Sequence, residues 1–174
     1  MRVYVPVTLS RLAEAYEAGE LGPGPLVAYA VTPGLREWYV SDDIEELEYA
    51  ALNRAAMASL RMVAAEAGAG AGAGTGAGGA WRRVVLAADV PEGAAVAAPD
   101  GAPLGEVRVG GVLPLGKVAA VHVDAGDAEG DVGAAVEVLG AADSGDEDAR
   151  FVVDGVEDHE LLWFATQEIP GLIA

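Results

Sequence analysis

The chain has 174 residues, 52% of them hydrophobic, and contains no cysteine. The lack of cysteine excludes disulfides, iron–sulfur clusters, thiolate zinc sites and cysteine nucleophiles. The net charge of −18, from 28 acidic and 10 basic residues, argues against nucleic-acid binding, which needs Lys and Arg to neutralise phosphates.

The length fits a single domain over residues 1–174, because domains typically contain about 100–200 residues. No apolar run approaches the roughly 18–20 residues that a membrane span needs, and the apolar stretch at the N-terminus is too short for a signal peptide. We therefore expect a cytoplasmic protein without a membrane partner.

The first elements follow from residue type and periodicity. The β-branched and aromatic run at 2–7 predicts a strand, and a helix over 8–18 follows, with Thr8 as its cap and Gly19 at its end. The apolar run at 26–32 predicts a buried second strand. A short helix over 35–39 precedes the most strongly periodic segment, a helix over 42–66 with Asp42 and Glu45 as an acidic capping box.

Residues 67–80 are almost entirely Gly and Ala, which predicts a flexible tether within the domain. A helix over 131–142 is predicted from its apolar face. The remaining elements of the second half are predicted strands, at 82–90, 106–109, 117–123, 149–153 and 160–166.

Without the short runs at 106–109 and 149–153, the predicted order is β-α-β-α, tether, β-β-α-β. Two halves that each resemble a β-α-β unit favour an α+β fold. We expect a ferredoxin-like open sheet with helices packed on one face.

The two histidines of the chain form the first candidate site. "HVD" contains His122 and Asp124, which share one face of a strand, and "EDHE" contains Asp158, His159 and Glu160 at the start of another. If the strands are neighbours, these side chains suit a transition metal that activates water for hydrolysis. The alternative is structural: His122 is a neutral core histidine, and His159 marks the point where a strand leaves an acidic surface loop.

Two further sequence patterns, an acidic run and a glycine string, have simple structural explanations. The acidic run "DDIEELE" at 42–48 has the composition of a divalent-cation site, but it is also what a solvated helix start favours. The glycines at 74, 76 and 79 match the dinucleotide fingerprint as a string, but they follow a helix and precede a strand, which is the wrong context.

Four aromatic residues form the last candidate group: Trp38, Tyr39, Trp163 and Phe164. They suit either a ligand groove or, at strand and helix positions, a hydrophobic core.

Five stretches together resemble a known family: "MRVYVPVTL", "VTPGLREWY", "EELEYAALNRAA", "VAAVHVD" and "EDHELLWFATQEIPGL". They are similar to an uncharacterised family of small actinobacterial proteins, a domain of unknown function. The resemblance covers both ends of the chain and the middle strand. It implies a stand-alone cytoplasmic bacterial protein, and it brings no activity, cofactor or catalytic residue.

No complete catalytic motif is present, so the leading hypothesis is a non-enzymatic binding or regulatory module that acts through protein contacts and needs no cofactor. The alternative is a metal-dependent hydrolase that uses His122, Asp124, Asp158 and His159, with Glu160 as a further metal ligand. A third possibility is a homodimer formed through a sheet edge.

Overall fold

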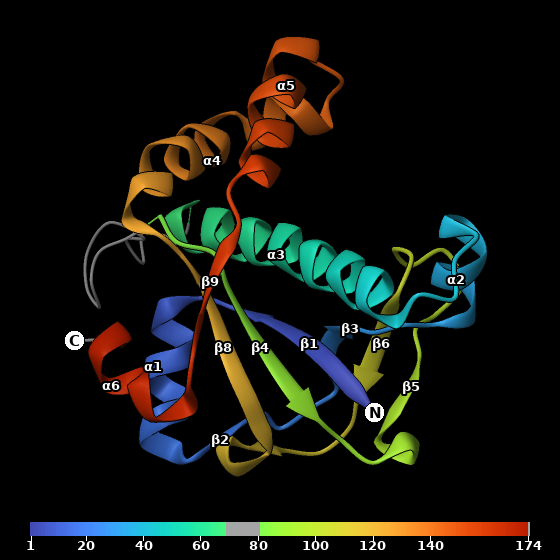
Figure 1. Ribbon diagram of the computed structural model, residues 1–174. Coiled ribbons are helices and arrows are strands. Elements are labelled where there is room, and N and C mark those ends of the chain that lie inside the picture. Colours follow the sequence, from blue (N-terminus) through green and yellow to red (C-terminus); the bar gives the residue numbers. More distant parts are fainter. Residues whose placement is uncertain (69–80, 174) are drawn as a thin grey trace.

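The computed structural model describes residues 1–68 and 81–173. Its largest feature is a seven-stranded sheet in which all neighbouring strands are antiparallel (Figure 1). The strands follow one another across the sheet in this order: β5 (Ala95–Ala97), β6 (Glu106–Val109), β3 (Leu26–Tyr29), β1 (Arg2–Val7), β4 (Val84–Asp89), β8 (Val118–Asp124) and β9 (Leu161–Phe164). A small second sheet pairs β2 (Glu20–Leu21) with β7 (Leu113–Pro114).

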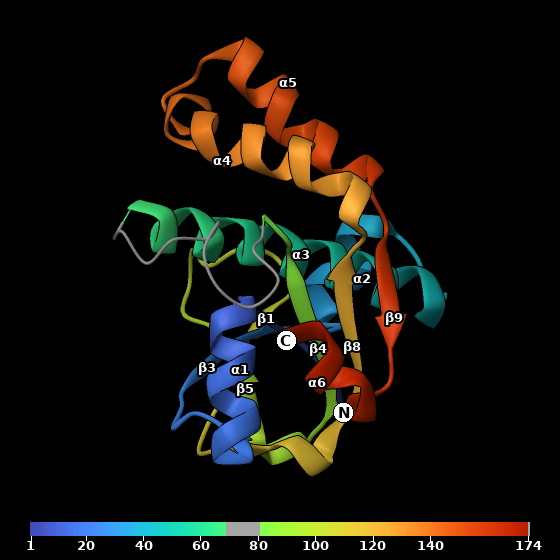
Figure 2. The ribbon, with the colours of Figure 1, turned by 90° about the vertical axis from the view of Figure 1, so that its left-hand side faces the viewer.

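Helices cover both faces of the large sheet (Figure 2). One face packs against α1 (Leu9–Ala18) and α6 (Ile169–Ile173), and the other packs against the long helix α3 (Ile44–Gly68). The short helix α2 (Pro33–Tyr39) contributes Leu35 to the α3 side.

The alternation of side chains along β1 explains the two cores. Val3, Val5 and Val7 point to the α1 side, whereas Tyr4 points to the α3 side. The neighbouring strand β4 divides its side chains in the same way. Because both faces of these central strands are apolar, both need a covering layer. The expected ferredoxin-like placement of helices on one face is therefore corrected to a sheet covered on both.

The helices α4 (Glu129–Asp143) and α5 (Glu147–Gly155) form a hairpin on the outer side of α3 (Figure 1). Leu60 of α3 is fully buried in this third core. Residues 149–153, predicted as a strand, lie within α5 instead. Asp146 caps the helix by accepting a hydrogen bond from the backbone of Ala149, and Ala149 and Val153 are buried at a spacing of four, which is a helical period.

Most other predicted elements are confirmed, including the strands at 2–7 and 106–109 and the first helix. Residues 69–80, which hold most of the predicted tether and the three-glycine string, lie outside the described residues. In the part of the chain that is described, no helix has both the length and the apolar character needed to cross a membrane.

Candidate functional site

Asp124 lies at the end of β8 and is committed to a buried ion pair. Its carboxylate accepts hydrogen bonds from Nε and Nη2 of Arg83 at 2.8 and 2.7 Å, and from the Arg83 backbone N–H at 2.9 Å. The side chains are only 3% (Arg83) and 0% (Asp124) exposed. The Arg83 guanidinium also donates to the backbone carbonyl of His159 at 2.9 Å. Asp124 therefore holds the start of β9 through Arg83, and its carboxylate is occupied.

The side chains of the "EDHE" stretch point to separate partners. His159 Nε2 lies 2.7 Å from the carboxylate of Asp131 on α4. Glu160 is exposed and accepts a hydrogen bond of 3.4 Å from the Tyr49 hydroxyl on α3. Asp158 is exposed in the short turn before β9.

His122 lies on the face of the sheet that α3 covers. Its neighbours across the sheet are Val85 on β4 and Trp163 on β9. Burial lowers the pKa of His122, and the positive charge of Arg2 lowers it further. These surroundings fit a neutral core histidine.

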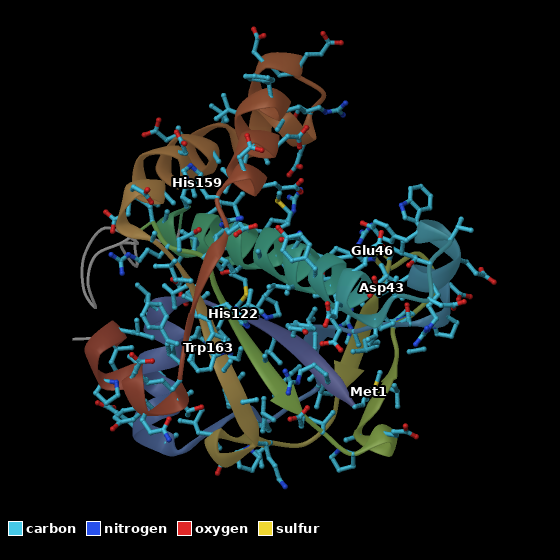
Figure 3. All side chains as sticks on the ribbon, viewed as in Figure 1. Met1, Asp43, Glu46, His122, His159 and Trp163 are labelled. Carbon is cyan, nitrogen blue, oxygen red and sulfur yellow. The ribbon has the colours of Figure 1, made fainter. Side chains whose placement is uncertain are left out.

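The structure does not bring the predicted metal ligands together. Figure 3 shows His159 near α4 and His122 on the sheet beside Trp163. Among residues 1–68 and 81–173, no three His, Asp or Glu side chains are placed to hold a metal ion. Nothing in the described residues therefore supports a shared site made of these side chains.

The acidic run at 42–48 serves the start of α3. Asp43 Oδ1 accepts hydrogen bonds from the backbone N–H groups of Glu45 and Glu46 at 3.0 and 3.4 Å. The capping acid is therefore Asp43, one residue later than the predicted Asp42. Glu46 accepts from the Ser41 hydroxyl, and Glu48 accepts from the Tyr4 hydroxyl, at 2.9 and 3.0 Å. Figure 3 shows Asp43 and Glu46 at the same end of the helix.

The four candidate aromatic residues do not share one groove. Trp38 is 71% exposed on α2, and Trp163 is 62% exposed on the edge strand β9. Phe164 is partly buried and packs against the core on the α1 side. Tyr39 lines a cleft.

This cleft is the best candidate site. Its lining combines apolar residues with these polar and aromatic ones: Tyr29, Tyr39, Asn53, Arg54, Arg61 and Glu157. It encloses about 440 Å³ and lies beside α3, bounded by α2, Pro103 and the turn after α5. A volume of ~300–1,000 Å³ with mostly apolar walls and a few polar groups is typical of small-molecule sites.

Arg54 is the decisive side chain of the cleft. Its Nε atom is buried and has no hydrogen-bond partner, and none of the described residues forms an ion pair with it. The loop before β6 covers its stem: a Cβ on Gly105, whose φ is +83°, would lie 3.9 Å from Arg54 Cδ. Leaving a buried polar group unpaired costs about 1–3 kcal/mol, and more for a charged group.

The charge balance makes this unpaired arginine informative. With 28 acidic residues against 10 basic ones, carboxylates are abundant in the chain. Six other arginines each have a carboxylate within 4 Å: Arg2, Arg36, Arg61, Arg82, Arg83 and Arg108. Among the described residues, Arg54 and the exposed Arg11 and Arg150 have no such partner. Of these three, Arg54 is the one that lines the cleft, so its positive charge remains available to a ligand there.

The floor of the cleft is polar next to Arg54. Burial raises the pKa of Tyr29, and the negative charge of Glu106 raises it further. The phenol therefore keeps its proton at neutral pH, beside the Glu106 carboxylate. Glu106 itself is paired with Arg108 at 2.6 Å, so its charge is already balanced. The cleft thus offers hydrogen-bond donors and the uncompensated positive charge of Arg54, with the carboxylate of Glu157 also in its lining.

Sequence reasoning did not identify this site. Arg54 and Arg61 lie in the helix predicted over 42–66 and belong to no motif. Their spacing of seven, which is two helical turns, was a usable signal, because it places both guanidinium groups on one side of α3.

Comparison with known proteins gives one match. A protein-family model described as a family of unknown function, DUF6912, matches residues 1–173. No curated protein and no solved structure matches the chain.

Proposed function

Because the chain belongs to this family of unknown function, whose description carries no activity, we propose a function from the site itself. The protein is a non-enzymatic binding module, and the cleft beside α3 binds a small organic anion such as a carboxylate or a phosphate ester. The observation that carries the proposal is the unpaired charge of Arg54 in a strongly acidic chain.

The chemistry of the cleft supports an oxyanion. A guanidinium group is planar and always charged, and it matches the geometry of carboxylates and phosphates. Asn53 adds a neutral donor, while Tyr39 and Met57 add surface for an apolar body. Glu157 at the rim disfavours a highly charged ligand by repulsion, so a singly charged anion fits best.

The alternative of a metal-dependent hydrolase has less support. Asp124 would have to leave Arg83, and removing one partner of a buried ion pair typically costs about 3–5 kcal/mol.

Anion binding is tested by calorimetric titration and thermal unfolding at constant ionic strength, with benzoate, citrate and inorganic phosphate as probes. We expect benzoate to bind, and at a hundred times its Kd to raise Tm by about 5–10 °C. Arg54→Gln should weaken binding at least about tenfold, because charge-assisted hydrogen bonds contribute roughly 1.5–3 kcal/mol.

The matched control is Arg36→Gln. It removes the same charge from an exposed arginine whose nearest carboxylate, on Asp42, is 3.8 Å away, and it should bind benzoate as the wild type does. The proposal fails if no probe anion stabilises the wild type more than chloride, or if both variants lose binding equally.

A protein partner is a second candidate, favoured by the surface at the end of α2. Trp38 is 71% and Val40 90% exposed, and Val40 has a φ of +49°. A β-branched residue in the left-handed region is strained, and such strain persists mainly at functional positions. Light scattering tests one such partner, a second copy of the chain: a dimer that Trp38→Ala dissociates supports it, and a monomer at high concentration contradicts it.

A further inference from the structure

A second cavity opens between β1 and β3. These two strands pair only at Tyr4 and Tyr29, and they do not pair between the Val7 end of β1 and the Leu26 end of β3. The space encloses about 330 Å³. We call this space the slot. Its walls are mainly apolar and include Val5, Val7, Leu26, Val27, Ala58 and Met62.

The slot adjoins the anion cleft. Ala58 of α3 lines both spaces. On β3, Val27 lines the slot and Tyr29, two residues further on the same face of the strand, lines the cleft. One turn separates Ala58 from Met62 in the slot and from Arg54 in the cleft. Val27 and Ala58 therefore place one end of the slot on the α3 side of the sheet, next to the cleft. Val5, Val7 and Leu26 belong to the core on the α1 side, so the slot runs from there through the gap between β1 and β3.

The two spaces differ in chemistry in a way that matches one kind of molecule. The cleft contains the unpaired Arg54 and several hydrogen-bond donors, whereas the slot has almost only aliphatic walls. A ligand that extends from one into the other would place a charge at Arg54 and bury a chain against Met62 and Val27. Burial of apolar surface would then add to the charge interaction.

We infer that the ligand of the cleft is an amphiphile with an anionic head and a short unbranched apolar tail, and that the tail passes Ala58 into the slot. This inference rests on the proposed function, since it needs the head to bind at Arg54. The volume of the slot, about 330 Å³, favours a tail of medium length rather than a long acyl chain.

Arg11 offers a competing position for the head. It lies at the border of the slot, is exposed, and forms no ion pair within the described residues. A head at Arg11 would reverse the ligand and leave Arg54 unused. Arg54 is favoured because its buried Nε lacks any partner, whereas water can satisfy the exposed Arg11.

The test is a series of linear carboxylates, from butanoate to octanoate, titrated calorimetrically below the concentration at which they form micelles. In the wild type, affinity should rise about fourfold for each added methylene, the factor that burial of one methylene provides. Met62→Trp, which fills the slot, should abolish this rise and leave benzoate binding unchanged. Tyr16→Trp, on the exposed side of α1, is the matched control and should keep the rise.

The outcomes separate the two proposals. If benzoate binds through Arg54 but affinity is independent of chain length, the cleft is an anion site and the tail inference is wrong. If Arg11→Gln abolishes octanoate binding and Arg54→Gln does not, the head lies at Arg11 and the inference is overturned. If neither benzoate nor octanoate binds, the proposed function itself fails.

Discussion

Arg83 and Asp124 show how strongly one pair of residues can determine local structure. Removing either charge leaves the other buried without compensation. We expect Arg83→Met to lower the free energy of unfolding by about 3–5 kcal/mol in urea denaturation. In the double variant Arg83→Met, Asp124→Leu, the free energy of unfolding should fall by much less than the sum of the decreases in the two single variants, because no charge then remains buried.

The control for this prediction is Arg61→Met. Arg61 pairs with Asp143 in the same two-bonded geometry, at 2.8 and 2.9 Å, but about half of each side chain is exposed. Exposed ion pairs contribute about 0–1 kcal/mol to the free energy of unfolding. Equal losses for Arg83→Met and Arg61→Met would contradict the role assigned to the buried pair.

The lowered pKa of His122 predicts that the stability of the protein depends on pH. Burial and the charge of Arg2 lower its pKa in the folded state below the ordinary value of 6.5, so the unfolded chain binds the proton more readily. The contribution of His122 to the free energy of unfolding is therefore fully present above pH 6.5. It is lost as the pH falls toward the pKa of His122 in the folded state. Between pH 7.5 and 5.5, the wild type should lose more stability than His122→Gln, measured as urea midpoints at each pH. Parallel curves for the two proteins would show that His122 does not contribute.

At the scale of elements, Ser59 connects α3 to two strands. Its hydroxyl donates to the carbonyl of Val7 on β1 at 2.7 Å and accepts from the N–H of Val84 at the start of β4 at 2.9 Å. The side chain is fully buried. The helix is thereby tied to the neighbouring strands at a point where two backbone groups would otherwise lack partners.

Ser59→Ala should leave both backbone groups unpaired. We expect a loss of about 2–4 kcal/mol in the free energy of unfolding, since each buried unpaired group costs roughly 1–3 kcal/mol. Ser144→Ala, at the exposed end of α4, should change stability by less than about 0.5 kcal/mol. A small effect at Ser59 would mean that a water molecule replaces the hydroxyl.

At the scale of the whole molecule, the net charge of −18 opposes folding through repulsion between acids. Raising the salt concentration from 0.01 to 0.15 M shortens the Debye length from ~30 to ~8 Å. We therefore expect Tm to rise over this range in calorimetry. The rise should persist in Arg54→Gln, because the repulsion is spread over the surface, and a rise lost in that variant would indicate chloride binding at Arg54 instead.

Local periodicity was enough to predict most elements of this chain. The β-branched run at 2–7 forms β1, and the apolar stripe with acids at its start forms α3. These predictions succeed because hydrogen bonds in a helix, and the alternation of side chains along a strand, depend on neighbours a few residues apart. Residues 149–153 were misassigned because a short apolar run fits both periods, and the cap at Asp146 decided between them.

The sequence by itself also determined that this is an acidic, cysteine-free chain with helices and strands that mix along its length. Only the tertiary structure decided which charges meet. Asp124 pairs with Arg83, 41 positions away, because β4 and β8 are neighbours in that register. Among the described residues Arg54 has no carboxylate partner, although the chain carries 28 acidic residues. The physical reason is that Coulomb and hydrogen-bond energies depend on distances in space, which packing of the sheet and helices sets and local sequence does not.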